Sequence, residues 1–128
     1  MFILNTHLDA GRSTSDRKAR AEQLNQILTK VKQVTSEEAL IVAGDLNLRW
    51  NDPQDSHLLE AFKEDLGLID SFEGVKFEKT RPVLDYILYR NGTTTTLEVL
   101  EVGEDPDFQY DNEPLSDHPA LFIRLLIR

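Results

Sequence analysis

Four short polar motifs stand at the ends of strand-like segments and carry residue types that can act on a phosphate or a metal ion. The first is Gly44-Asp45-Leu46-Asn47, which follows an uninterrupted apolar run. Strand side chains alternate between two faces, so we expect Asp45 and Asn47 side by side at the carboxyl end of a sheet, where open α/β sheets place ligands. A carboxylate and an amide there can hold a hard cation or orient a water molecule. The alternative is a turn with no chemical role, for which these residues are equally suited.

A histidine and a carboxylate in the second half of the chain form the next group. Ser116-Asp117-His118 precedes the last apolar run, and the motif Leu84-Asp85-Tyr86 lies inside residues 83–88, where an unpaired carboxylate is costly to bury. His118 can transfer protons near neutral pH, and a carboxylate partner would fix its tautomer. We therefore predict that Asp85 pairs with His118 and that Asp117 can ligate a metal ion. The alternatives are a polar start of a strand and an Asp on a solvated edge strand.

A second histidine ends the first apolar segment. Asn5-Thr6-His7 closes the strand-like run that begins at Phe2, and His7 could donate to a phosphoryl oxygen. The alternative is a structural histidine at a strand end. We interpret His57 as a surface residue.

Hydrophobic periodicity predicts the elements that position these residues. Helices are expected over residues 16–34, with Ser15 as N-cap, and over 57–66, ending at Gly67. Strands are expected over 2–6, 39–43, 83–89, 94–102 and 119–127, with a hairpin turn at Asn91-Gly92. This order predicts an α/β fold with a mixed β-sheet of about five strands and helices on one face. Because residues 39–43 are apolar on both faces, we expect a second copy to cover the bare face.

Composition limits the classes of function. The chain has 128 residues, which suits a single domain, and a net charge of −9, which opposes non-specific binding to nucleic acid. It has no cysteine, so thiolate metal sites are excluded and the cytoplasm is slightly favoured. The sequence shows no signal peptide and no apolar run long enough for a transmembrane helix.

With Arg20-x-x-Gln23 on the first predicted helix, the four motifs as a set resemble the endonuclease/exonuclease/phosphatase superfamily, hydrolases similar to pancreatic deoxyribonuclease. The resemblance implies that residues 1–128 are the C-terminal half of such a domain, one half of a four-layer α/β/β/α sandwich.

The resemblance also implies a role for each residue. Asp45 would position or activate the attacking water, which Asn47 would orient. His118, held by Asp85, would act on the phosphate or as general base, and His7 would stabilise the charge that develops. Asp117, Asp45 and Asn47 would ligate Mg²⁺ (or Mn²⁺). Arg20 and Gln23 are expected to be structural.

Two residues that are typical of the family have no match in this sequence. No residue matches the asparagine and the metal-binding glutamate of the first half, so we expect a fragment that lacks that half. The predicted function is metal-dependent phosphoester hydrolysis as part of a longer parent. The substrate could be a nucleic acid, a sphingolipid or an inositol phosphate. The alternative is a catalytically incomplete fragment that acts as a folding or assembly unit without turnover, with a second copy or the missing half covering the bare sheet face.

Overall fold

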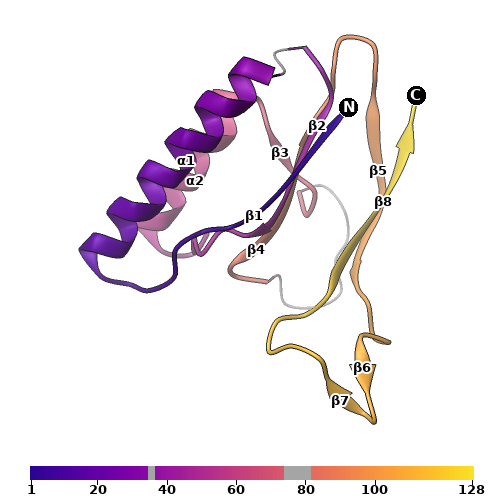
Figure 1. Ribbon diagram of the computed structural model, residues 1–128. Helices are drawn as coiled ribbons and strands as arrows, with labels where there is room; N and C mark the ends of the chain where they lie inside the picture. Colours follow the sequence, from indigo (N-terminus) through magenta and orange to yellow (C-terminus); the bar gives the residue numbers. More distant parts are fainter. Residues whose placement is uncertain (35–36, 74–81) are drawn as a thin grey trace.

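The computed structural model describes residues 1–34, 37–73 and 82–128 and shows two helices on one side of a central sheet (Figure 1). The elements in chain order are β1 (Phe2–His7), α1 (Thr14–Val34), β2 (Leu40–Asp45), α2 (Pro53–Leu66), β3 (Ile69–Asp70), β4 (Asp85–Arg90), β5 (Leu97–Glu104), β6 (Gln109–Tyr110), β7 (Glu113–Pro114) and β8 (Leu121–Ile127). In the described parts of the chain, neither helix has the length and apolar character needed to cross a membrane.

The central sheet is mixed and has the order β1-β2-β4-β3. Strand β1 runs parallel to β2, while β4 runs antiparallel to both β2 and β3. The register aligns His7 with Asp45 and Asp45 with Asp85 across three neighbouring strands. The predicted α/β fold, with a mixed sheet and helices on one face, is confirmed, and the central sheet has four strands among the residues that the structure describes.

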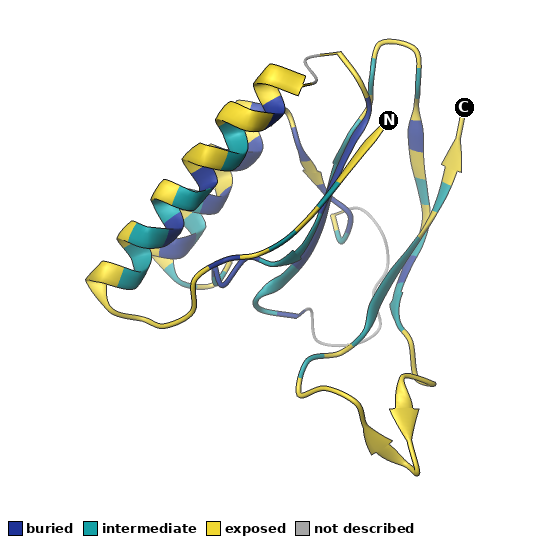
Figure 2. Cartoon of the chain, in the orientation of Figure 1, coloured by how far each residue is buried: buried dark blue, intermediate teal, exposed yellow. Residues whose placement is uncertain are grey.

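Helices α1 and α2 cover one face of this sheet and form the main core with it. Alternate residues of β2 and β4, such as Val42 and Leu88, point toward this face and are fully buried. They pack with Leu24 of α1 and Leu59 of α2. The outward side of α1 is exposed (Figure 2), so the helices form the outer layer. Every second residue of the apolar run in β2 is therefore buried against the helices.

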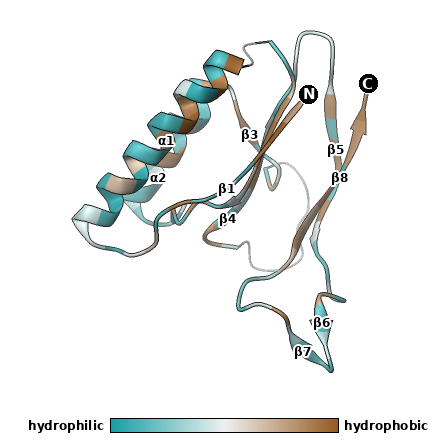
Figure 3. Ribbon diagram, in the orientation of Figure 1, coloured by the Kyte–Doolittle hydropathy of each residue, from teal (hydrophilic) through white to brown (hydrophobic). Residues whose placement is uncertain are grey.

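The other face of the sheet is covered in part by the chain itself, which corrects the expectation that it is left bare. Ile41 of β2 and Ile87 of β4 pack against Leu97 of β5 and against apolar residues of β8. Strands β5 and β8 form a separate two-stranded ribbon on this side, and Figure 3 shows that β8 is apolar along much of its length. Ile3 remains 67% exposed beyond the ribbon. Self-association remains a prediction.

The predicted hairpin between the strands at 83–89 and 94–102 is wrong. Within the described residues, β5 pairs with β8, and β4 pairs with β2 and β3. The side chain of Asn91 accepts a hydrogen bond from the backbone N–H of Leu97 at 2.7 Å, and Thr93 N–H donates to the Glu37 carbonyl. Through these contacts the turn residues connect β4 of the central sheet to β5 of the β5–β8 ribbon.

Both helices begin earlier than predicted. Ser13, and not Ser15, caps α1, since its Oγ accepts from Asp16 N–H while the Asp16 carboxylate accepts from Ser13 N–H. Helix α2 begins at Pro53 with Asp52 as N-cap. Proline suits the first helical position because its missing N–H is not needed there. Residues 53–56, which precede the predicted helix, therefore belong to α2.

Candidate active site

The carboxyl end of β2 brings the polar motifs together. Asp45 is the last residue of β2, beside His7 on β1 and Asp85 on β4. Gly44 precedes it with φ of +135°, and a Cβ there would collide with the Thr6 carbonyl oxygen. Only glycine allows β1 and β2 to approach this closely at the point where their catalytic-type side chains emerge.

His118 and Asp85 form the pair that the sequence predicts. His118 Nδ1 lies 2.7 Å from Asp85 Oδ2, and the His118 backbone N–H donates to Ser116 Oγ. The hydrogen bond with Asp85, followed by the charge of Asp85, raises the pKa of His118; the charges of Asp45 and Asp117 act in the same direction and partial burial opposes it. The imidazolium form is therefore favoured relative to a free histidine.

Asp45 lies between the two histidines. Its Oδ2 is 3.5 Å from His7 Nε2 and 3.9 Å from His118 Nδ1. The side chain of His7 is 71% exposed, whereas that of Asp45 is 14% exposed. Asp45, Asp85 and His118 offer ligand atoms within 4.8 Å of one another and form a group that could hold a metal ion.

Asn47 reaches this site by a turn and not by strand alternation, which corrects the geometric argument from sequence. Strand β2 ends at Asp45, and Asn47 has φ of +49°, a conformation that asparagine tolerates better than most residues. Its N–H donates to Asp45 Oδ1 at 2.8 Å, and its Nδ2 donates to the Leu8 carbonyl at 2.9 Å. The turn thus fixes the Asp45 carboxylate and links the loops after β1 and β2.

Asp117 does not join the group of Asp45, Asp85 and His118 in the described structure. It is exposed and borders a hollow of about 290 Å³ between the β6–β7 hairpin and the segment before β8, and His118 borders the same hollow. Its predicted role as a metal ligand stays a prediction.

Arg20 and Gln23 hold the loop after His7, in agreement with their expected structural role. Gln23 Oε1 accepts from Asp9 N–H, while Arg20 Nη1 donates to the Asp9 and Gly11 carbonyls. The sequence analysis missed Asp55, which faces Arg20 from α2. The Asp52-Pro53 pair is a helix-start signal that places Asp55 in the first turn of α2, but it does not indicate Arg20 as the partner.

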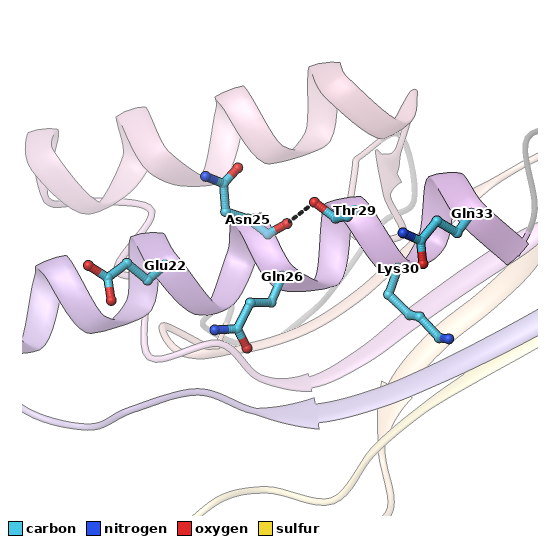
Figure 4. A pocket seen from close by; sticks show the side chains of 6 residues that line it. All are labelled: Glu22, Asn25, Gln26, Thr29, Lys30 and Gln33. Carbon is cyan, nitrogen blue, oxygen red and sulfur yellow. Dashed lines mark hydrogen bonds between the residues drawn. The ribbon is translucent and has the colours of Figure 1, made fainter.

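The surface of the described residues has several hollows, and they differ in whether they border the polar cluster. One of about 210 Å³ borders Asn5, Gly44 and Asp85 and therefore adjoins the polar cluster. A broader hollow of about 570 Å³ runs along α1 (Figure 4). Its side chains project from one helix face, and the hydrogen bond from Thr29 Oγ1 to the Asn25 carbonyl stays within that helix. We place the site where the hollow that borders Asp85 and the hollow that borders His118 adjoin, since Pro119 lines both of them.

Comparisons with known proteins agree with this fold and set of motifs. The model of the endonuclease/exonuclease/phosphatase family matches residues 5–118. This chain belongs to that family.

The similar proteins are longer than this chain, which matches only part of each of them. Sphingomyelinases of Mycobacterium bovis and Mycobacterium tuberculosis are 32% identical over 137 aligned positions, which include 94% of this chain and 26% of each sphingomyelinase. A Beutenbergia cavernae endonuclease/exonuclease/phosphatase has a similar fold, with a TM-score of 0.70 and 20% identity over 96% of this chain and 35% of its own. The human Nocturnin catalytic domain has a TM-score of 0.61 at 23% identity, covering 98% and 47%. The chain thus spans about a quarter of the curated relatives.

Proposed function

We propose that residues 1–128 are the C-terminal half of a metal-dependent phosphoesterase domain and supply its proton-transfer and phosphate-contacting groups. The observation that carries this proposal is the His118–Asp85 pair at 2.7 Å, with Asp45 Oδ2 at 3.9 Å from the same imidazole nitrogen. Membership of the family supports phosphoester chemistry for this arrangement.

The histidines would act on the phosphoryl group. Asp85 holds Nδ1 of His118, so Nε2 is the nitrogen through which the ring exchanges a proton or donates to an oxygen. The raised pKa of His118 favours the imidazolium, which stabilises negative charge on phosphoryl oxygens. The exposed His7 adds a second donor on the far side of Asp45. Asp85 is a positioning residue in this scheme.

Asp45 would orient the attacking water and accept its proton. Its Oδ1 is held by Asn47 N–H, so Oδ2 is the oxygen that faces the histidines. Asn47 uses Nδ2 on the Leu8 carbonyl, and its Oδ1 is the amide atom suited to contact water or a cation. This division gives proton acceptance to Asp45 and charge stabilisation to His118.

The donor set fits a hard divalent cation through its carboxylates. Asp45 and Asp85 supply oxygen atoms, while His118 Nδ1 is held by Asp85. Mg²⁺ (or Mn²⁺) uses few carboxylates and keeps several waters, so Asp45 would hold it with help from Asn47 and Asp117. When bound, such an ion polarises a phosphoryl oxygen and acidifies a bound water.

The substrate class that we favour is a sphingomyelin-type phosphodiester. The similarity to mycobacterial sphingomyelinases supports it, and the net charge of −9 weighs against nucleic acid. Parallel assays with sphingomyelin in detergent micelles, single-stranded DNA and an inositol phosphate test this choice. Release of phosphate from the inositol phosphate alone would overturn it.

The test of the function itself uses bis-p-nitrophenyl phosphate with Mg²⁺ or Mn²⁺. We expect the Asp45→Ala and His118→Ala variants to lose hydrolysis by at least about 100-fold, the scale of acid–base contributions. His57→Ala is the matched control, because His57 is exposed on α2 and should leave the rate unchanged. Equal rates in all three variants would contradict the proposal.

A second candidate function is a folding or assembly unit without turnover. The observation that favours it is coverage, since the chain spans 26% of the sphingomyelinases that it resembles. A folded chain that shows no hydrolysis with either cation would support this candidate and restrict the phosphoesterase to a longer parent. Hydrolysis that depends on Asp45 would exclude it.

A further inference from the structure

A buried ion pair links the two loops that follow the candidate catalytic strands. Arg20 of α1 is 0% exposed and Asp55 of α2 is 2% exposed, and Arg20 Nη2 lies 3.6 Å from Asp55 Oδ1. The pair joins α1 to α2. Each partner also bonds to the backbone of a different loop.

Arg20 holds the loop that follows His7. Its Nη1 donates to the Asp9 carbonyl and to the Gly11 carbonyl, both at 3.0 Å. Gln23, one helical turn further along α1, accepts from Asp9 N–H at 2.9 Å. The path of the chain immediately after His7 is therefore set by side chains of α1.

Asp55 holds the loop that follows Asn47. Its Oδ2 accepts from Arg49 N–H at 3.2 Å, and its Oδ1 lies 3.4 Å from Arg17 Nε. The two loops meet where Asn47 Nδ2 donates to the Leu8 carbonyl. A displacement of either loop would therefore move Asn47 relative to the end of β1.

Stability alone explains this pair poorly. Removing two charged groups from water is expensive, and well-packed apolar residues of similar volume often replace a buried ion pair without loss of stability. Apolar residues, however, cannot bond to three backbone groups in two loops. The directional hydrogen bonds are what the charged pair provides and what an apolar pair would lack.

We propose that Arg20 and Asp55 are positioning residues that set the geometry of His7 and Asn47 around Asp45. The proposal deepens the proposed function and rests on it for its catalytic meaning. Neither residue touches the reacting atoms, so each acts through the loop that it holds. Loss of the pair should leave a folded chain whose candidate active site is misaligned.

The deciding variant is the double substitution Arg20→Met/Asp55→Leu, which removes both charges and fills the space with apolar side chains. The matched control is Lys63→Met/Glu73→Gln, because Lys63 is also a buried cation paired with carboxylates, at 2.8 Å from Glu73 and 3.1 Å from Glu60. That pair has no contact with either loop among the described residues.

Nuclear magnetic resonance gives a readout that does not require activity. In the Arg20/Asp55 double variant we expect displaced resonances for the Asn47 side-chain amide, the Asp9 N–H and the His7 ring, together with cooperative urea unfolding. The control should leave these resonances in place. Unchanged resonances in the double variant would overturn the proposal. Should the double variant fail to fold, isosteric Asp55→Asn, which removes the charge that faces Arg20, is judged by the same resonances.

Kinetics separate this proposal from the proposed function. If the wild type hydrolyses the model phosphodiester, the double variant should lower kcat by at least about tenfold with a smaller change in KM, as expected for lost transition-state alignment. Unchanged kcat would overturn the positioning role. A wild type without any hydrolysis refutes the enzymatic function of this chain, while the resonances still decide whether the pair sets the loops.

Discussion

Gly44 sets the distance between the strands that carry His7 and Asp45, and its replacement by alanine tests this part of the fold most directly. Gly44 has φ of +135°, and a Cβ built on it lies far inside contact distance of the Thr6 carbonyl oxygen. That oxygen is backbone, so a side-chain rotation cannot relieve the collision. Strand β1 must move away from β2 at the residues before His7.

Gly67 offers a control that also has a positive φ but no collision. It ends α2 with φ of +64°, and nothing lies within 4 Å of a Cβ built there. Gly67→Ala should therefore cost only the left-handed backbone penalty, about 1 kcal/mol. For Gly44→Ala we add about 2 kcal/mol for the loss of a half-buried hydrogen bond between β1 and β2 to a backbone strain of about 1 kcal/mol, which gives about 3 kcal/mol in total. In a domain of this size that corresponds to a Tm lower by roughly 10 °C.

Equilibrium urea unfolding followed by circular dichroism measures both free energies. We expect the Gly44→Ala variant to lose about 2 kcal/mol more than the Gly67→Ala variant, because only the former contains the collision. Losses that agree within about 0.5 kcal/mol would refute the claim that close approach of β1 and β2 requires glycine, since that is the scale of ordinary surface substitutions.

Three further predictions concern the candidate site and its supports. Because Asp85 raises the pKa of His118 in the folded chain, their pairing stabilises the fold below the unfolded histidine pKa and is lost as the pH rises through the folded value. The His118→Gln variant should therefore lose more unfolding free energy at pH 5 than at pH 9, and a pH-independent loss would contradict the pairing. Asp52→Ala removes the N-cap of α2 and should cost about 1 kcal/mol in urea unfolding, whereas an unchanged midpoint would exclude the cap. Tyr86→Phe leaves the buried Leu48 carbonyl without its hydroxyl donor and should cost about 1–2 kcal/mol by thermal unfolding; no loss would show that the carbonyl finds another partner.

Local patterns predicted the helices and strands well wherever the spacing of apolar residues determines the structure. The apolar run ending at Gly44 gave β2, and the three-and-four spacing of apolar residues gave α1. The position of β5 could not be predicted this way, because Asn91-Gly92 is a hairpin signal in isolation. The local preference of Asn91-Gly92 for a hairpin was overridden by contacts with residues far away in sequence. Thr93 N–H bonds to the Glu37 carbonyl, and β5 pairs with β8.

The pairing within the candidate site was predictable for a different reason. Residues 83–88 are mostly apolar, which predicted a cost for burying the charge of Asp85 and hence a nearby partner. The structure places Asp85 at the start of β4, partly buried, and the partner is His118. The turn at Asn47 was not predictable by alternation, since a strand that ends at Asp45 no longer alternates. Asp55 was missed because its partners, Arg20 and the Arg49 N–H, come from segments that only the packing of α1 against α2 brings together.

The charges of the site explain what this chain supplies and what must be added to it. His118 compensates Asp85 at 2.7 Å, whereas Asp45 has only longer contacts with His7 and His118, at 3.5 and 3.9 Å. Asp45 is therefore the carboxylate with the weakest compensation and the natural place for a cation or for a proton taken from water. Its Oδ1 is already fixed by Asn47, so its orientation does not depend on the cation. In the proposed mechanism this chain would supply the groups for proton transfer, and the further oxygen ligands that Mg²⁺ requires would come from water, substrate or another part of a longer parent.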